Sequence, residues 1–187
     1  MARVKKNILV QGLSGMLGKT IVFRQVGDET IVTSRPVHNG KATVKQKAQQ
    51  AKFTQAVQYA NGQMADPAAK AEYALAKDKL FDTSFNIAVA DFLGSPNVQE
   101  IDTIAYKGKV GDKIRVRAVD DFKVASLLVQ VLKADNTVAE QGQAVQQANK
   151  IDWVYTATTA IATLTGFKVV ASAKDKPGNT ASQTKTL

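Results

Sequence analysis

The chain has 187 residues, no cysteine, a single histidine and a formal net charge of +9. The absence of cysteine excludes disulfides, thiolate zinc sites, iron–sulfur clusters and cysteine nucleophiles, and a lone His38 excludes any mechanism that needs two imidazoles. An apolar fraction of 44% and a charged fraction of 22% are typical of one globular domain or two small ones.

The first 36 residues contain short strand signals separated by glycine-rich turns. Residues 7–10 are a short strand candidate, and glycines then make a tight or flexible loop up to Gly18. Residues 19–25 and 29–35 are β-branched runs on either side of a Val-Gly-Asp turn, which is the strongest hairpin signal in the chain. Pro36 lacks the amide that a strand ladder needs, so it ends the second strand.

The glycine-rich segment 12–20, Gly-Leu-Ser-Gly-Met-Leu-Gly-Lys-Thr, nearly matches a phosphate-binding loop. Leu13 stands where that loop requires its first glycine. The loop must also open a helix, whose first amides hold the phosphates, whereas a β-branched run follows here. The sequence therefore favours a glycine turn, or a place where another backbone comes close.

Helical signals occupy residues 43–94. A capping box at residues 43–46 starts a first helix, and an alanine-rich apolar stripe continues through it. Asp66 and Pro67 read as the N-cap and first position of a second helix that ends near residue 80. A third helix is predicted from residue 83 or 84 to Gly94.

From Val98 the apolar period changes to two, as in half-buried strands. A β-sandwich is predicted, with Trp153 and Tyr155 on one face as core anchors. Its strands are expected at residues 114–120, 127–132, 138–140, 153–157, 162–164 and 167–173, with a last one after the turn at 176–179. The predicted fold class is α+β: domain 1–95 is a basic hairpin with about three helices, and domain 96–187 is an antiparallel β-sandwich.

Several motifs of the C-terminal half resemble those of bacterial immunoglobulin-like domains. They are Val116-Arg-Ala-Val-Asp-Asp, Ala139-Glu-Gln-Gly, Trp153-Val-Tyr and Ala171-Ser-Ala-Lys-Asp-Lys-Pro-Gly-Asn. The N-terminal half, with Gly12-Leu-Ser-Gly-x-x-Gly, Val22-Phe-Arg-Gln, Ser34-Arg-Pro and Gln46…Phe53, is similar to an uncharacterised family common in Bacteroidetes. The first resemblance implies an immunoglobulin-like fold and adhesion, decoration or assembly; the second brings no catalytic residue.

The positive charge is concentrated at the N-terminus. Residues 1–50 hold nine basic and two acidic residues, or +7, and the remaining 137 hold 16 and 14, or +2. This asymmetry predicts a surface that meets an anionic partner, and an ordinary soluble surface with a basic bias is the alternative. The candidate anion-binding residues are Arg3, Lys5, Lys6, Lys19, Arg24 and Arg35.

Acidic residues flank two expected turns of the sandwich. Asp120, Asp121 and Asp175, with Asn179, have the oxygens that calcium binds, and paired carboxylates also serve in acid–base catalysis. Turn formation is the commoner role of Asp and Asn, so calcium binding at these residues is left open. No serine has a plausible triad partner. We therefore expect no catalytic site, no enzyme activity and no cofactor.

These patterns predict a non-enzymatic structural or assembly protein, such as a phage virion or surface-decoration component. Its partners would be copies of itself or other structural proteins, and a nucleic-acid-binding protein is the alternative. No apolar run reaches the roughly 18 residues that span a bilayer, and the basic start has too short an apolar patch for a signal peptide. We expect a cytoplasmic protein, or one carried in a particle assembled there, without membrane insertion.

Overall fold

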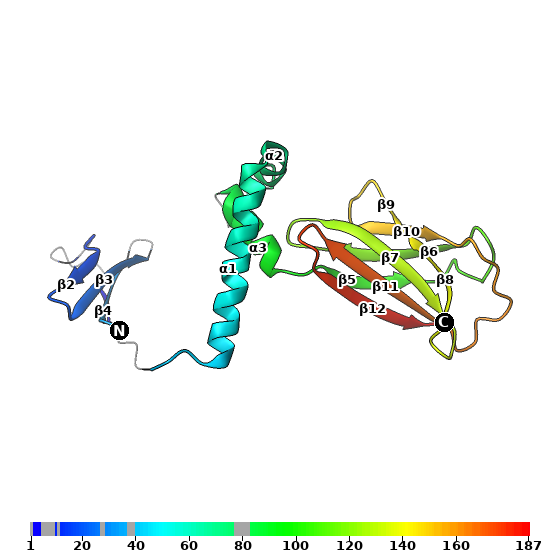
Figure 1. Ribbon diagram of the computed structural model, residues 1–187, viewed down its shortest axis with the longest axis horizontal. Helices are drawn as coiled ribbons and strands as arrows, with labels where there is room; N and C mark the ends of the chain where they lie inside the picture. Colours follow the sequence, from blue (N-terminus) through cyan, green and yellow to red (C-terminus); the bar gives the residue numbers. More distant parts are fainter. Residues whose placement is uncertain (1, 5–9, 11, 27–28, 37–39, 77–82) are drawn as a thin grey trace. The chain divides into compact units, whose positions relative to one another are not determined.

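The computed structural model describes residues 2–4, 10, 12–26, 29–36, 40–76 and 83–187, and Figure 1 shows their elements. The chain divides into two compact units, Met1–Val44 and Lys45–Leu187, called here the N-terminal unit and the C-terminal unit. The N-terminal unit is a sheet, and the C-terminal unit combines helices with antiparallel sheets. This confirms the predicted α+β class.

The N-terminal sheet has the strand order β1-β4-β3-β2. Its strands are β1 (Ala2–Val4), β2 (Gly15–Leu17), β3 (Ile21–Val26) and β4 (Glu29–Ser34). β3 and β4 are the predicted hairpin, paired from Ile21 opposite Ser34 to Val26 opposite Glu29. β2 was expected to be loop, and it forms because it pairs with β3; Gly15 and Gly18, at its two ends, adopt positive φ angles that allow the chain to turn there. A strand rather than a helix follows these glycines, which agrees with the glycine-turn interpretation.

The helices are α1 (Val44–Ala65), α2 (Pro67–Ala74) and α3 (Ser84–Leu93), and side-chain N-caps begin α2 and α3. The Asp66 side chain accepts from the Ala68 amide at 2.9 Å, and the Thr83 hydroxyl accepts from the Asn86 amide at 3.2 Å, so both predicted starts are confirmed. α2 ends at Ala74, before the predicted end near residue 80, and residues 77–82 lie outside the described part. In that part no helix has both the length and the hydropathy to cross a bilayer.

The first three turns of α1 are exposed on every side. Burial in this helix starts at Ala56 and recurs at Ala60, whereas Val44 is 85% and Phe53 51% exposed. The predicted apolar stripe is therefore packed only in its second half. The first turn also contains Lys45 and Lys47 and no acid, which opposes the helix dipole instead of complementing it.

The remaining strands form two antiparallel sheets, β5-β6-β10-β9 and β12-β11-β7-β8, seen as two layers in Figure 1. They are β5 (Asn97–Asp102), β6 (Lys113–Val119), β7 (Val124–Leu132), β8 (Val138–Gln143), β9 (Val145–Gln146), β10 (Asp152–Thr156), β11 (Lys168–Asp175) and β12 (Thr180–Thr186). In immunoglobulin lettering, β5, β6 and β7 are strands A, B and C, β8 is C′, and β9 to β12 are D to G. The two sheets are then ABED and GFCC′. This is the immunoglobulin-like strand order, so the predicted sandwich is confirmed.

Alternating side chains of both sheets fill the sandwich core. On β6, Ile114, Val116 and Ala118 point inward while Arg115 and Arg117 pair with acids outside. The two predicted anchors are in place: Trp153 is 6% and Tyr155 3% exposed. The sandwich therefore has an apolar core of its own, in which Val and Ala are the commonest residues and these two rings are among the largest.

One carboxylate is buried at the edge of this core. Glu140, on β8, is 5% exposed and accepts from the Tyr155 hydroxyl at 2.7 Å, from the Thr159 amide at 3.1 Å, and from both the amide and the hydroxyl of Thr158. Burial raises the pKa of Glu140, but these four donors outweigh it and hold the pKa below the ordinary 4.5. The ionised side chain fastens the loop after β10 to β8.

Some sequence expectations for this half were wrong or incomplete. Residues 162–164, expected as a strand, are irregular, because the chain there packs Leu164 onto the core without a partner ladder. The short strand β9 and the strand β5 were not predicted. The predicted domain boundary between residues 95 and 96 stays a prediction, and it falls between the end of α3 and the start of β5.

We expect Glu140→Gln to destabilise the protein at neutral pH by about 1–2 kcal/mol, because a charge-assisted acceptor is replaced by a neutral one. Since the folded pKa of Glu140 lies below 4.5, the extra stability of the wild type is present above about pH 4.5 and is lost as pH falls through the folded value. Urea unfolding of both proteins between pH 7 and pH 3 measures this difference. The exposed Glu100→Gln serves as control, and a pH-independent difference would contradict the assignment.

Candidate functional site

The predicted anion-binding residues lie at two places on the N-terminal sheet. Lys19 is in the turn between β2 and β3, and the amide of Arg35 donates to the Thr20 carbonyl at 2.8 Å, which brings these two basic residues to the same end of the sheet. Arg24 on β3 is paired with Ile31, whose other neighbour in the sheet is Arg3 of β1. Lys5 and Lys6 lie outside the described residues.

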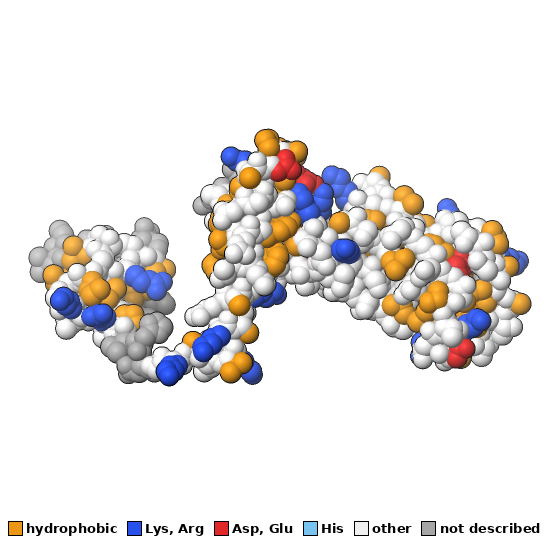
Figure 2. All heavy atoms as spheres, in the orientation of Figure 1, with side chains coloured by type: hydrophobic (Ala, Val, Ile, Leu, Met, Phe, Trp, Pro, Cys, Tyr) orange, Lys and Arg blue, Asp and Glu red, His pale blue; other side chains and the backbone are white. Residues whose placement is uncertain are grey.

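The side chains of Lys19, Arg24 and Arg35 are all exposed, which is the minimum that binding requires. Figure 2 shows basic and apolar side chains side by side on the visible face of the N-terminal unit. The described residues therefore offer a mixed basic and apolar surface instead of one compact basic cleft. Anion binding by these residues stays a prediction.

Large apolar side chains are exposed in the same unit, and among its residues 10, 12–26, 29–36 and 40–44 no apolar one is buried. Among the residues of this unit whose burial is described, Thr30 is the buried one, at 1% exposure. Its hydroxyl accepts from the Gln25 side chain at 2.8 Å and from the Gly12 amide at 3.2 Å. The buried residue of this sheet is thus polar, and it lies near the start of β4. The exposed apolar residues are Leu13 at 44%, Met16 at 56%, Leu17 at 63%, Ile21 at 39% and Val26 at 49%.

In the C-terminal unit, Phe122 joins the helices to the sandwich. It lies in the loop between β6 and β7 and stacks on Tyr73 of α2, with ring centroids 4.2 Å apart and planes at 25°. Tyr73 is fully buried in a cluster with Ala60, Ile87 and Ala88. One aromatic side chain of the sandwich therefore completes the small core of the helices.

Charged groups surround this aromatic contact. Glu72 of α2 forms ion pairs with Lys123, next to Phe122, and with Lys176, in the turn after β11, the second at 2.6 Å. These lysines hold the pKa of Glu72 below its ordinary value. The Lys176 ammonium also lies 4.6 Å from the centre of the Tyr73 ring. The helices are therefore attached through two sandwich loops, B–C and F–G.

Three carboxylates meet beneath the aromatic contact. Asp91 from α3, Asp120 from the B–C loop and Asp175 from the end of β11 each place one oxygen within 4.8 Å of the other two. The sequence suggested Asp120 and Asp175 as joint calcium ligands, and the structure places oxygens of these two residues close together. Asp121 does not belong to this trio, whereas Asp91 does. Nothing in the sequence singled out Asp91, because it lies inside a predicted helix.

The three carboxylates differ in their surroundings. Asp175 is fixed by the amides of Gly178 and Asn179 at 2.7 and 2.6 Å and by the Asn179 side chain at 2.8 Å, which is the turn role expected of it. Asp91 is 2% exposed, and its Oδ2 accepts from the Tyr73 hydroxyl. Burial, which outweighs this hydrogen bond, raises the pKa of Asp91 to about 7, and burial also raises the pKa of Asp120.

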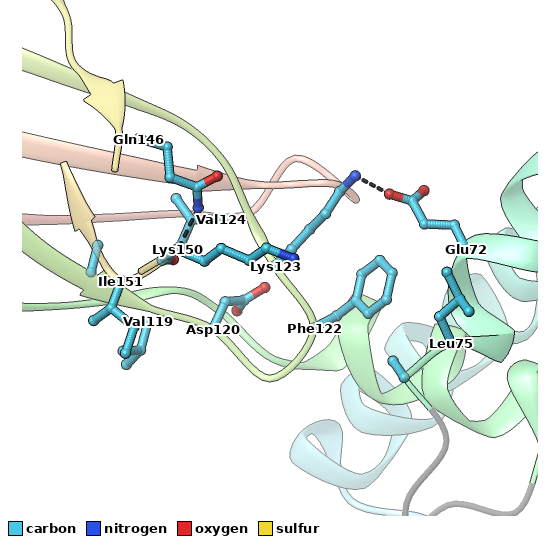
Figure 3. A pocket seen from close by; sticks show the side chains of 12 residues that line it. Glu72, Leu75, Val119, Asp120, Phe122, Lys123, Val124, Gln146, Lys150 and Ile151 are labelled. Atoms are coloured by element: carbon cyan, nitrogen blue, oxygen red, sulfur yellow. Dashed lines mark hydrogen bonds and ion pairs between the residues drawn. The ribbon is translucent and has the colours of Figure 1, made fainter. Parts of the chain in front are cut away.

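A pocket of about 450 Å³ opens beside this junction. Figure 3 shows Glu72 and Leu75 on its helical side and Asp120, Phe122 and Lys123 on its sandwich side, with the Lys123–Glu72 ion pair joining the two sides. Its walls mix apolar and charged groups. Of the three carboxylates that could hold a cation, Asp120 lines the pocket, whereas Asp91 and Asp175 do not.

We expect Phe122→Ala to lower the free energy of unfolding by about 2–3 kcal/mol, because it removes a half-buried ring from the helical core. Phe53→Ala is the matched control: the ring is 51% exposed on α1, so its removal should change stability by no more than about 0.5 kcal/mol. Denaturant unfolding followed by helix circular dichroism measures both. Equal effects of the two substitutions would contradict the role given to Phe122.

Comparison with known proteins adds little to this picture, since no protein-family model and no curated protein matches the sequence. Among solved structures, the chain is similar to an engineered protein, with a TM-score of 0.34 and 18% identity over 50% of this chain and 18% of that one. It is also similar to a tetra-tandem repeat in the extending region of a large adhesion protein, with a TM-score of 0.33 and 19% identity over 49% and 23%. The chain spans 18% and 23% of the length of these structures, and neither similarity assigns it a function.

Proposed function

We propose that this chain is a non-enzymatic structural protein that assembles with copies of itself into a larger particle, such as a phage virion or a decorated surface, made in the cytoplasm. The N-terminal unit is the assembly part, and the immunoglobulin-like sandwich is the displayed part. Other structural proteins of the particle are further partners, and no cofactor takes part.

The observation that supports this proposal is the exposed apolar surface of the N-terminal unit. A sheet is stable when one of its faces is buried, and a unit of 44 residues has little apolar surface to bury by itself. In the described part of this unit Met16, Leu17 and Val26 are about half exposed or more, and the buried residue is Thr30. Contact with another protein surface would supply the missing apolar burial.

The edge of the sheet favours a second copy as that surface. Within the described residues β2 is an outer strand, and its Met16 and Leu17 are exposed. An exposed apolar edge strand pairs readily with a strand of another chain, and identical chains commonly associate through symmetric contacts. The basic charge of the unit makes copies repel, so salt should not weaken such an assembly.

The virion or decoration role is supported by analogy. Immunoglobulin-like sandwiches commonly serve as displayed modules in adhesion and decoration, although a fold does not fix a function. A small chain with a docking sheet at one end of its sequence and a sandwich at the other suits this use. The helices attach to the B–C and F–G loops, so they and the sandwich would be displayed together.

We expect the purified protein to form oligomers that persist in about 1 M NaCl, where surface charges are screened. Leu17→Lys should make it monomeric, because a charge on β2 opposes edge pairing. Val110→Lys is the matched control, since Leu17 and Val110 are both 63% exposed and Val110 lies in the C-terminal unit. Light scattering after gel filtration measures all three proteins. A wild-type monomer at every protein and salt concentration would contradict self-assembly.

Nucleic-acid binding is the second candidate function, favoured by the exposed Lys19, Arg24 and Arg35. It predicts binding that weakens steeply with salt, with a slope of about 0.7–0.9 per phosphate contact. Replacing Arg3, Lys5, Lys6, Arg24 and Arg35 together by Ala should abolish it. The control removes five charges from the C-terminal unit, at Lys107, Lys109, Lys113, Lys133 and Lys150. Fluorescence anisotropy with labelled DNA and RNA measures both, and unchanged binding by the first variant would exclude this function.

A further inference from the structure

We propose that Asp91, Asp120 and Asp175 bind a Ca²⁺ ion that joins helix α3 to the B–C and F–G loops of the sandwich. The three residues come from segments far apart in the sequence, and their oxygens meet within 4.8 Å of one another. Oxygens on opposite sides of a Ca²⁺ ion, each at about 2.3–2.6 Å from it, have this separation. The site is separate from the surface proposed for assembly.

Two oxygens of the trio have no donor, and this is the second observation that points to a ligand. Asp91 is 2% exposed, and its Oδ1 lies buried without a hydrogen-bond partner, while Oδ2 is occupied by the Tyr73 hydroxyl. The Oδ2 of Asp120 is likewise buried without a partner. Buried carboxylate oxygens are rarely left bare, because each has lost the water that solvated it. A cation between the two would replace that water.

The local charge favours a cation as well. The trio and Glu72 bring four carboxylates to the junction, whereas Lys123 and Lys176 bring two ammonium groups, and both of these are paired with Glu72. The junction is therefore acidic in a chain whose net charge is +9. The three donors to Asp175, the amides of Gly178 and Asn179 and the Asn179 side chain, are neutral groups and do not offset this negative charge.

The chemistry of the donors selects the ion. All of them are carboxylate oxygens, and in the part of the chain that the structure describes neither histidine nor cysteine accompanies them, which disfavours zinc and copper. Mg²⁺ prefers near-octahedral sites with one or two carboxylates and several waters, whereas Ca²⁺ accepts more carboxylates and an irregular geometry.

Terbium luminescence tests the proposal on the full chain. Tb³⁺ occupies calcium sites, and the Tyr73 hydroxyl donates to Asp91, so the tyrosine ring is close enough to transfer excitation energy to the ion. After treatment with EDTA, we expect tyrosine-sensitised Tb³⁺ emission that Ca²⁺ displaces at about 1 mM or below, and Mg²⁺ only at higher concentration. Ca²⁺ should also raise the melting temperature of the wild type.

Asp91→Asn keeps an oxygen to accept from Tyr73 but removes one ligand charge, so it should weaken Ca²⁺ binding at least about tenfold. Asp120→Asn should also weaken Ca²⁺ binding, and it provides a second test in case Asp91→Asn does not fold. Asp135→Asn, at an exposed turn away from the trio, should bind like the wild type. No sensitised emission, or equal Ca²⁺ responses of the wild type and both site variants, would overturn the proposal. Stabilisation of the protein at lower pH without any response to Ca²⁺ would also overturn it, because a proton shared between the carboxylates would then take the place of the ion.

Discussion

The organisation of this protein depends on where apolar surface is buried. The sandwich buries Ile, Val and Leu side chains of two sheets against each other and fixes its core with Trp153 and Tyr155. Among residues 10, 12–26, 29–36 and 40–44 of the N-terminal unit no large apolar side chain is buried, and the buried residue is Thr30, near the start of β4. Burial drives folding and association by the same physics, so this difference is the basis for assigning display to one unit and assembly to the other.

The junction between helices and sandwich uses a different set of interactions. Phe122 gives the helices an apolar contact that they lack by themselves, and Glu72 pairs with a lysine from each loop. In many sandwiches of this topology the B–C and F–G loops are free to bind ligands. Here they are occupied by the chain's own helices, and an acidic trio is enclosed beneath the contact. These two loops thus attach the sandwich to the helices of the same chain.

Local chemistry made much of the fold predictable. The starts of α2 and α3 follow from Asp66 and Thr83, whose side chains accept from backbone amides two and three residues on. The strands of the sandwich other than β5 and β9 follow from the period-two pattern, and the Asp175 turn follows from the usual bonding of Asp to nearby amides. Each of these features is decided by neighbours in the sequence.

Features that depend on distant partners were missed. Asp91 looks like any polar residue of a helix until folding brings Tyr73, Asp120 and Asp175 around it. β2 is three residues long and is a strand because β3 pairs with it. Residues 162–164 have β-branched and apolar side chains but no partner strand, so propensity misled the prediction there. Pairing and clustering are tertiary events that a single sequence does not encode locally.

Hydrogen–deuterium exchange at two protein concentrations tests the central claim most directly. If contact with other chains stabilises the N-terminal sheet, amides of β3 and β4 should exchange quickly in dilute solution and become protected as concentration rises, while amides of β7 and β11 in the sandwich should be protected throughout. Slow exchange of β3 and β4 at a dilution where the chain is monomeric would contradict the account, because it would show that the N-terminal unit is stable without a partner.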